Sequence, residues 1–286
     1  VNKAKKNWNS VGDHAPAYLI NLYLATGEEN YAKFLEDTFD TICDHFPDYG
    51  YSPFMNEKFF DDWTHDLKWG IHQARCVVGH NLKVAWNLTR MHSLMPKESY
   101  KTFAHQIADA IPAAGCDNQR GGWYDMMERT LKDGEENYRR VWHDRKAWWQ
   151  QEQGILAYYI MAGVYDDKPE YLSFAREGTA FYNGWFLDYE SGGIYFNVLA
   201  NGQPYALGSE RGKGSHSMAG YHSFELCFLA AIYSNLLVNK QPMDFYFKPD
   251  PQGWPDNKLR IAPDLLPKGS VELSEVWIDD KNYTDF

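Results

Sequence analysis

Long apolar runs and basic residues are both scarce in this sequence. No run approaches the ~18 apolar residues that a membrane-spanning helix needs. Lys and Arg number 28 against 39 Asp and Glu, which gives a formal net charge of −11. Binding to phosphate backbones requires clustered Lys and Arg, and no basic run is sustained. We therefore expect a soluble globular protein that binds a neutral or cationic small molecule and neither nucleic acid nor membrane.

Cysteine is scarce as well. The four cysteines form neither a CxxC pair nor a dense framework, which predicts buried, reduced thiols and no zinc site or disulfide scaffold. No charged start followed by an apolar stretch marks a secretion signal, which favours a cytoplasmic protein. The chain begins with Val1 and not Met, which indicates a trimmed or partial polypeptide.

A repeat of about seventy residues organises most of the chain. Segments that begin at Glu29, Glu98 and Pro169 open alike, and each carries apolar residues at three- and four-residue intervals. This spacing predicts amphipathic helices. Gly-Gly turns at 121–122 and 192–193 follow the second and third segments and predict short β-hairpins on one rim.

A second set of predicted helices lies between these segments, over residues 13–26, 78–94, 146–162 and 217–237. They are apolar nearly all round, which predicts burial. Alternating outer and inner helices describe helical hairpins, which either stack as a solenoid or curl into an (α/α) toroid. Four inner and three outer helices are too few for a six-hairpin ring. We expect an all-α, partial barrel over residues 1–240, completed by a missing amino-terminal segment or by another chain; a homodimer is also open.

The composition changes after residue 240. Residues 241–286 are rich in Pro, Asp and Gly, and the segments DFYFK (244–248) and VELSEVWID (271–279) alternate as strands do. They predict a β-type carboxyl-terminal extension with no catalytic cluster. Elsewhere, Asp61, Asp62 and Asp66 surround His65, and a solvated loop with capping aspartates is a better interpretation of that group than a cation site.

Three polar residues fall in repeat register: His80, Gln151 and His222 are each 71 residues apart. They are therefore expected at one level of three successive inner helices. A buried polar group without a partner costs ~1–3 kcal/mol, so three at one level favour a wet, functional cavity. In the alternative interpretation, each histidine is simply hydrogen-bonded within the core.

Three segments occur in a telling order: Gly79-His80 with Trp86, then KAWWQQ (146–151), then Lys213-Gly214 followed by Tyr221-His222. In order and spacing they resemble signature segments of the N-acylglucosamine 2-epimerase family, which includes cellobiose 2-epimerases and aldose-ketose isomerases. His14, after NWNSVGD, is similar to a further histidine at the start of an earlier inner helix. The resemblance covers roughly residues 1–240 and implies a six-hairpin (α/α) barrel whose first helices lie outside this chain.

The resemblance also implies a reaction. Such enzymes remove the C2 proton of an open-chain sugar, form an enediolate, and return the proton to C1 or to the opposite face of C2. His80 and His222 would be the acid-base pair, since the unperturbed histidine pKa of ~6.5 permits both roles near neutral pH. The implied substrate-binding residues are His14, Trp86, Trp149, Gln151 and Gln153. Neither a metal nor another cofactor is needed, and the expected partner is a small sugar.

The sequence departs from the family pattern around these residues. Lys83 and Gln153 stand where the family has glutamates, while Glu152 next to Gln153 would point about 100° away on a helix. Ser217 and Met218 replace a tryptophan and a lysine, and the family's amino-terminal arginine has no counterpart.

Two alternative functions follow. The departures favour a non-catalytic carbohydrate-binding or scaffolding module on the same barrel, whereas the two histidines favour a sugar 2-epimerase or aldose-ketose isomerase. A glycoside hydrolase or lyase would want two facing carboxylates ~5–9.5 Å apart, and no such pair falls in repeat register.

Overall fold

Helices dominate the computed structural model, which describes residues 6–68, 75–141, 144–214, 218, 220–248 and 258–283. The outer helices are α2 (Glu29–His45), α4 (Glu98–Gly115) and α6 (Glu170–Trp185). The inner helices are α1 (Ala15–Thr26), α3 (Val78–Leu94), α5 (Trp148–Val164) and α7 (Gly220–Ile232). Two π-helices, Asn9–Asp13 and Tyr233–Val238, precede α1 and extend α7. The predicted helical hairpins are confirmed.

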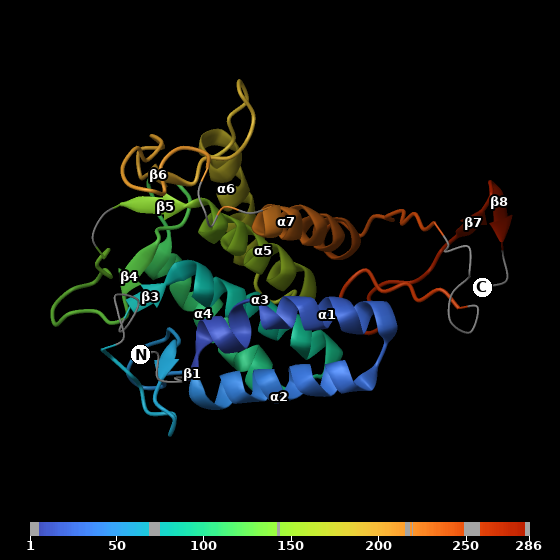
Figure 1. Ribbon diagram of the computed structural model, residues 1–286, viewed down its shortest axis with the longest axis horizontal. Helices are drawn as coiled ribbons and strands as arrows, with labels where there is room; N and C mark the ends of the chain where they lie inside the picture. The colour runs from blue at the N-terminus through green and yellow to red at the C-terminus, as the bar shows by residue number, and fades with distance from the viewer. Residues whose placement is uncertain are drawn as a thin grey trace.

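The inner helices form a row with the outer helices packed on it (Figure 1). Helix α3 packs on α4 and α5, and α5 packs in turn on α6 and α7, while α1 pairs with α2. The outer helices follow the amphipathic rule: α2 buries Ala32, Leu35, Phe39 and Ile42, which recur at three- and four-residue steps on one face.

Burial differs between the middle and the ends of the row of inner helices. Every residue from Val78 to Met91 of α3 is buried. At the two ends of the row the prediction of full burial is wrong. Phe224 of α7 is 76% exposed and Tyr18 of α1 is 64% exposed, and Leu22 and Phe228 are exposed beside them. Apolar side chains on α1 and α7 thus face solvent.

Short antiparallel strand pairs form the predicted rim. β1 (Lys6–Asn7) pairs with β2 (Lys58–Phe59), β3 (Arg75–Val77) with β4 (Met126–Glu128), and β5 (Arg145–Ala147) with β6 (Asn197–Leu199). The Gly-Gly turns are closed by single bridges, Cys116 to Trp123 and Leu187 to Ile194. Because β3 and β5 run directly into α3 and α5, their pairing fixes where these inner helices begin.

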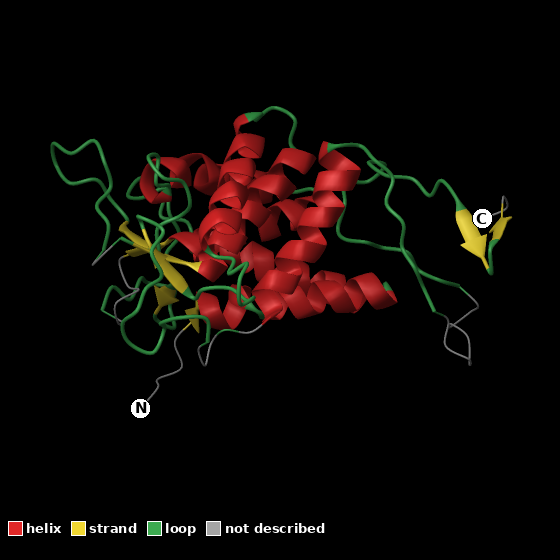
Figure 2. Ribbon diagram, turned by 90° about the horizontal axis from the view of Figure 1, so that it is seen from above, coloured by secondary structure: helices red, strands yellow, loops and turns green. Residues whose placement is uncertain are grey.

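The carboxyl-terminal segment contains a hairpin of β7 (Val276–Ile278) and β8 (Lys281–Tyr283), which stands apart from the helices in Figures 1 and 2. Residues 244–248 do not form the predicted strand. Part of the segment belongs to the helical core: Asp264 and Leu265 are buried, and Asp264 accepts hydrogen bonds from Arg90 of α3 and from Tyr233.

Two further expectations can be compared with the structure. All four cysteines are free, but Cys76 is fully buried whereas Cys227 is exposed on α7. Among the helices of the described residues, none is long and apolar enough to cross a membrane.

Candidate active site

His80 lies in the first turn of α3, which approaches α5 closely. A Cβ on Gly79 would come within 2.5 Å of the Trp149 ring, so only glycine permits this approach. The Gly79 amide donates to Gln150 Oε1 at 2.7 Å. The Gly-His pair thereby sets the imidazole of His80 beside Trp149, with ring centroids 5.2 Å apart.

Glu57, which sequence reasoning missed, is the partner of His80. His80 Nδ1 lies 3.0 Å from Glu57 Oε2, and the two residues are 8% and 4% exposed. Burial alone would lower the pKa of His80, but the charge and hydrogen bond of the Glu57 carboxylate outweigh it, so the pKa is raised. His80 therefore keeps its proton to higher pH than a free histidine.

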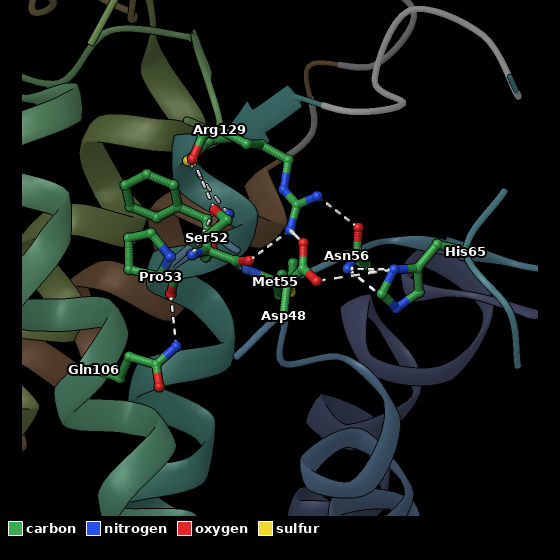
Figure 3. Close-up of polar contacts among 11 residues, drawn as sticks. Asp48, Ser52, Pro53, Met55, Asn56, His65, Gln106 and Arg129 are labelled. Atoms are coloured by element: carbon green, nitrogen blue, oxygen red, sulfur yellow. Dashed lines mark hydrogen bonds and ion pairs between the residues drawn. The ribbon is translucent and has the colours of Figure 1, made fainter. Parts of the chain in front are cut away.

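A network around Arg129 holds the segment that carries Glu57 (Figure 3). The Arg129 guanidinium donates to Asn56 Oδ1 at 2.6 Å, and to Asp48 Oδ2 and the Phe54 carbonyl at 2.8 Å. Ser52 Oγ donates to the Arg129 carbonyl at 2.8 Å. Arg129, the residue after β4, thus holds four groups of this loop through hydrogen bonds. Glu57 directly follows Asn56, the last residue that Arg129 binds.

The loop is also tied to the helices. The Met55 amide donates to Asn81 Oδ1 of α3 at 3.0 Å, and Gln106 Nε2 of α4 donates to the Pro53 carbonyl at 3.0 Å (Figure 3). Because Asn81 is the neighbour of His80, the loop and the start of α3 are positioned together.

His222, on the first turn of α7, has the opposite environment. Its Nδ1 lies 3.3 Å from Gln153 Nε2, which can only donate, so the imidazole accepts. Burial lowers the pKa of His222 to about 3, and the positive charge of Lys83 acts in the same direction. The imidazole of His222 is therefore neutral at physiological pH.

Trp149 joins the two histidines. Its indole centroid lies 5.2 Å from the His80 ring and 5.8 Å from the His222 ring. The two imidazoles, from α3 and α7, are thus brought to one region by a half-buried aromatic residue of α5.

The predicted glutamines have different surroundings. Gln153 Oε1 accepts from Trp86 Nε1 at 2.8 Å, so Gln153 links Trp86 to His222. Gln151 instead bonds the rim: its Oε1 accepts from the Trp123 amide and its Nε2 donates to the Trp123 carbonyl, both at 2.7 Å. Gln151 is fully buried and saturated by backbone, so it is not positioned like the histidines despite the shared register.

His14 lies at the edge of this region. Its side chain is 53% exposed, its Nε2 lies 3.2 Å from Asp13 Oδ2, and its ring packs edge-on against Tyr221 at 5.5 Å. Tyr221 in turn contacts the His222 ring at 4.8 Å. His14 is therefore close to His222 through one aromatic residue.

Lys83 of α3 is buried between Asp13 and Tyr221. It is 1% exposed, its Nζ lies 3.2 Å from Asp13 Oδ1, and it donates to the Tyr221 hydroxyl at 3.0 Å. Burial would raise the pKa of Asp13, but Lys83, His80 and His14 together outweigh it and lower the pKa. The Tyr221 hydroxyl donates onward to Glu225 Oε1 at 3.3 Å.

Glu152 points away from this cluster, as the helical geometry predicts. It is fully buried between α6 and α7, where its Oε1 accepts from the Tyr182 hydroxyl at 2.6 Å and from Ser223 Oγ at 2.7 Å. Burial raises the pKa of Glu152 to about 7. The Glu152 carboxyl thus links α5 to the helix that carries His222 and keeps its proton to higher pH than an ordinary glutamate.

Two cavities lie away from the histidines. One of about 460 Å³ is on the rim beside Arg120 and Phe181, and one of about 530 Å³ is at the far end of α3 and α5, beside His92 and Tyr165. The acidic loop forms local turns, in which Asp62 accepts from Thr64. Within the residues that the structure describes, no group of three or more His, Cys, Asp or Glu could hold a metal ion.

Helical hairpins whose inner helices carry a buried His80 and a half-buried His222 identify the chain as an (α/α)-barrel protein. Residues 3–222 match the family described as N-acylglucosamine 2-epimerase (GlcNAc 2-epimerase). The chain belongs to this family. The predicted resemblance is therefore confirmed. A comparison with curated proteins gave no match.

Solved structures share the fold. A cellobiose 2-epimerase from Bacillus thermoamylovorans has a TM-score of 0.61 at 20% identity, covering 77% of this chain and 51% of its own. A D-mannose isomerase has a TM-score of 0.65 at 19% identity, covering 81% and 56%. A cellobiose 2-epimerase from Spirochaeta thermophila has 0.61 at 19%, covering 77% and 50%. The chain thus spans about half the length of these proteins.

Proposed function

We propose that this protein is a sugar 2-epimerase or aldose-ketose isomerase that works by proton transfer between histidines and C2 of an open-chain sugar. One observation carries the proposal: His80 and His222 flank Trp149 and have pKa values shifted in opposite directions. Two titratable groups whose surroundings separate their pKa values are suited to be an acid and a base.

The pKa directions assign the roles. Neutral His222 takes the C2 proton, and the electron pair of that C–H bond forms the enediolate with the carbonyl. His80, protonated beside Glu57, supplies a proton. Delivery to the opposite face of C2 gives the epimer, whereas delivery at C1, with the O2 hydroxyl proton moving to O1, gives the ketose. Each turnover moves one proton from the sugar to His222 and one from His80 to the sugar. Proton exchange with solvent then returns both histidines to their starting protonation states.

The neighbouring residues support binding. Trp149 offers an aromatic face between the histidines, on which a sugar ring or chain packs. Trp86 and Gln153 form a bonded pair that orients His222, and His14 lies at the exposed edge where hydroxyl groups of a sugar are within reach. In this proposal Gln151 acts on the site indirectly, because its amide holds the backbone of Trp123 on the rim.

Further helices complete the ring in this proposal. The exposed apolar side chains of α1 and α7 lie on the two end members of the row of inner helices. On each helix the two side chains lie one turn apart, Tyr18 with Leu22 and Phe224 with Phe228, as on a helix face that packs against a neighbour. Additional hairpins, supplied by a segment outside this chain or by another chain, would cover both helices and close the sugar site.

Solvent isotope exchange tests the proposal. The full-length protein is incubated with cellobiose, mannose or N-acetylglucosamine in deuterium oxide, and deuterium at C2 is measured by NMR. We expect incorporation that falls by about 100-fold or more in His80→Ala and His222→Ala. His92→Ala, at the far end of α3, is the matched control and keeps the rate. Sugar binding without exchange would instead identify a carbohydrate-binding module.

A further inference from the structure

Lys83 connects three inner elements of the site. It stands on α3, pairs with Asp13 at the end of the first π-helix, and donates to Tyr221 on α7. The ammonium also lies over the Tyr221 ring, 4.9 Å from its centroid. No contact of this kind is needed to hold α3 itself, because α3 is already packed on α4 and α5.

Burying an ammonium group costs free energy because the charge loses its water, so a buried lysine usually has a role in the fold or in a site. Lys83 is among the largest fully buried side chains, and ion pairs in such places are often no better for stability than apolar side chains of similar volume. Lys83 binds Tyr221, the residue that precedes His222. It therefore places a positive charge near the proposed proton acceptor.

We infer that Lys83 is a positioning residue that keeps His222 unprotonated and oriented, through its charge and its bond to Tyr221. This inference rests on the proposed role of His222 as the base. A protonated His222 cannot accept the C2 proton, so a nearby cation that disfavours the imidazolium extends the active pH range downward.

The surroundings of His222 support this assignment of charge. Helix α5 faces His222 with neutral groups only, namely Trp148, Trp149 and Gln153. The charged or titratable groups that face it come from the other elements: His80 and Lys83 of α3, Asp13 and His14 at the first π-helix, and Tyr221 and Glu225 of α7. Among the charges acting on His222, Lys83 has the largest effect, and Asp13 opposes it.

The opposition of Lys83 and Asp13 gives a test that does not depend on activity. Histidine titrations of the full chain are followed by NMR from about pH 2 to about pH 8, a range that spans both the His222 pKa of about 3 and the ordinary histidine value. In the unmodified protein His222 should titrate near the acid end of this range. Lys83→Met should raise its midpoint by about one pH unit or more, whereas Asp13→Asn should not raise it. Lys83→Arg should behave as the unmodified protein.

The outer helices provide a matched control. Lys97 pairs with Asp40, which also accepts from Tyr100, so Lys97→Met removes a similar Lys-Asp-Tyr group far from His222. This variant should leave the His222 titration unchanged. If Lys83→Met does not fold, Asp13→Asn/Lys83→Met is compared with Asp13→Asn, and the double variant should have the higher His222 midpoint.

Two results would overturn the inference: an unchanged His222 midpoint in Lys83→Met, or equal upward shifts in Lys83→Met and Asp13→Asn, which indicate lost packing alone. Deuterium exchange adds a second readout. As pH is lowered, the exchange rate of Lys83→Met should begin to fall at a higher pH than that of the unmodified protein. If the unmodified protein shows no exchange with any sugar, the proposed function fails, while the titrations still decide the role of Lys83.

Discussion

Glu57 Oε2 lies 3.0 Å from His80 Nδ1, across 23 residues of chain. Glu57→Gln removes the negative charge that raises the His80 pKa and leaves burial, which lowers it. We expect the His80 titration midpoint, measured by NMR, to fall by about one pH unit or more. Glu98→Gln on the outer helix α4 is the control. A His80 midpoint that is the same in both variants would show that Glu57 does not set it.

The same pair predicts how stability depends on pH. Because the folded pKa of His80 is raised, the pair stabilises the protein fully below about pH 6.5, the unfolded value, and this contribution is lost as pH rises through the folded pKa. Urea unfolding should therefore show a larger deficit for His80→Gln at pH 6 than at pH 9. An equal deficit at both pH values would contradict the raised pKa.

Arg129 is expected to act on His80 from a distance. Arg129→Met leaves Asp48 and the Phe54 carbonyl without their donor and should lower the free energy of unfolding by about 3–5 kcal/mol. It should also lower the His80 midpoint, because the loop that presents Glu57 loses its anchor. Arg139→Met removes an exposed pair with Glu135 and should leave stability nearly unchanged.

Glu152→Gln should stabilise the protein at high pH. The folded pKa of Glu152 is about 7 against an ordinary 4.5, so the folded state holds its proton more tightly and loses stability as pH rises between these values. The variant avoids this loss, which amounts to about 3 kcal/mol above pH 7. Denaturant unfolding at pH 5 and pH 8 measures it. Parallel behaviour of the two proteins across that range would rule out a buried, protonated Glu152.

Gln153→Leu tests whether Gln153 connects Trp86 to His222. The Trp86 indole loses its acceptor, and an unsatisfied buried donor costs about 1–3 kcal/mol. The indole Nε1–H resonance of Trp86 should shift upfield in proton NMR, and the His222 resonances should move with it. Gln119→Leu, on the exposed rim, is the control and should leave both unchanged.

The sequence predicted the helices well because their signal is periodic. The expected inner helix at 78–94 coincides with α3, and the shared register of His80 and His222 places both beside α5. Gln151 shares this register, but its amide is bound by the backbone of Trp123 on the rim. A repeat predicts the level of a residue on its helix but not which neighbour takes its hydrogen bonds.

Glu57 could not be found in this way. Its counterpart one repeat later is Glu128, 71 residues on, and that carboxylate pairs with Arg75 on the rim. Equivalent glutamates thus have different partners. The loop that brings Glu57 to His80 is held by Arg129 and Asn81, which are far from it in sequence, so no local pattern announces the contact. The burial of Lys83 likewise depends on Asp13 and Tyr221 from other repeats.

The ion pair between Arg90 and Asp264 has a consequence for synthesis. The two residues are 174 positions apart, and both are buried. A nascent chain on the ribosome can assemble α3, but Arg90 stays without this counterion until Asp264 has left the exit tunnel. The helical body therefore cannot reach its final state before the segment around Asp264 has been synthesised. A chain stopped after the last helix would retain an uncompensated guanidinium in its interior.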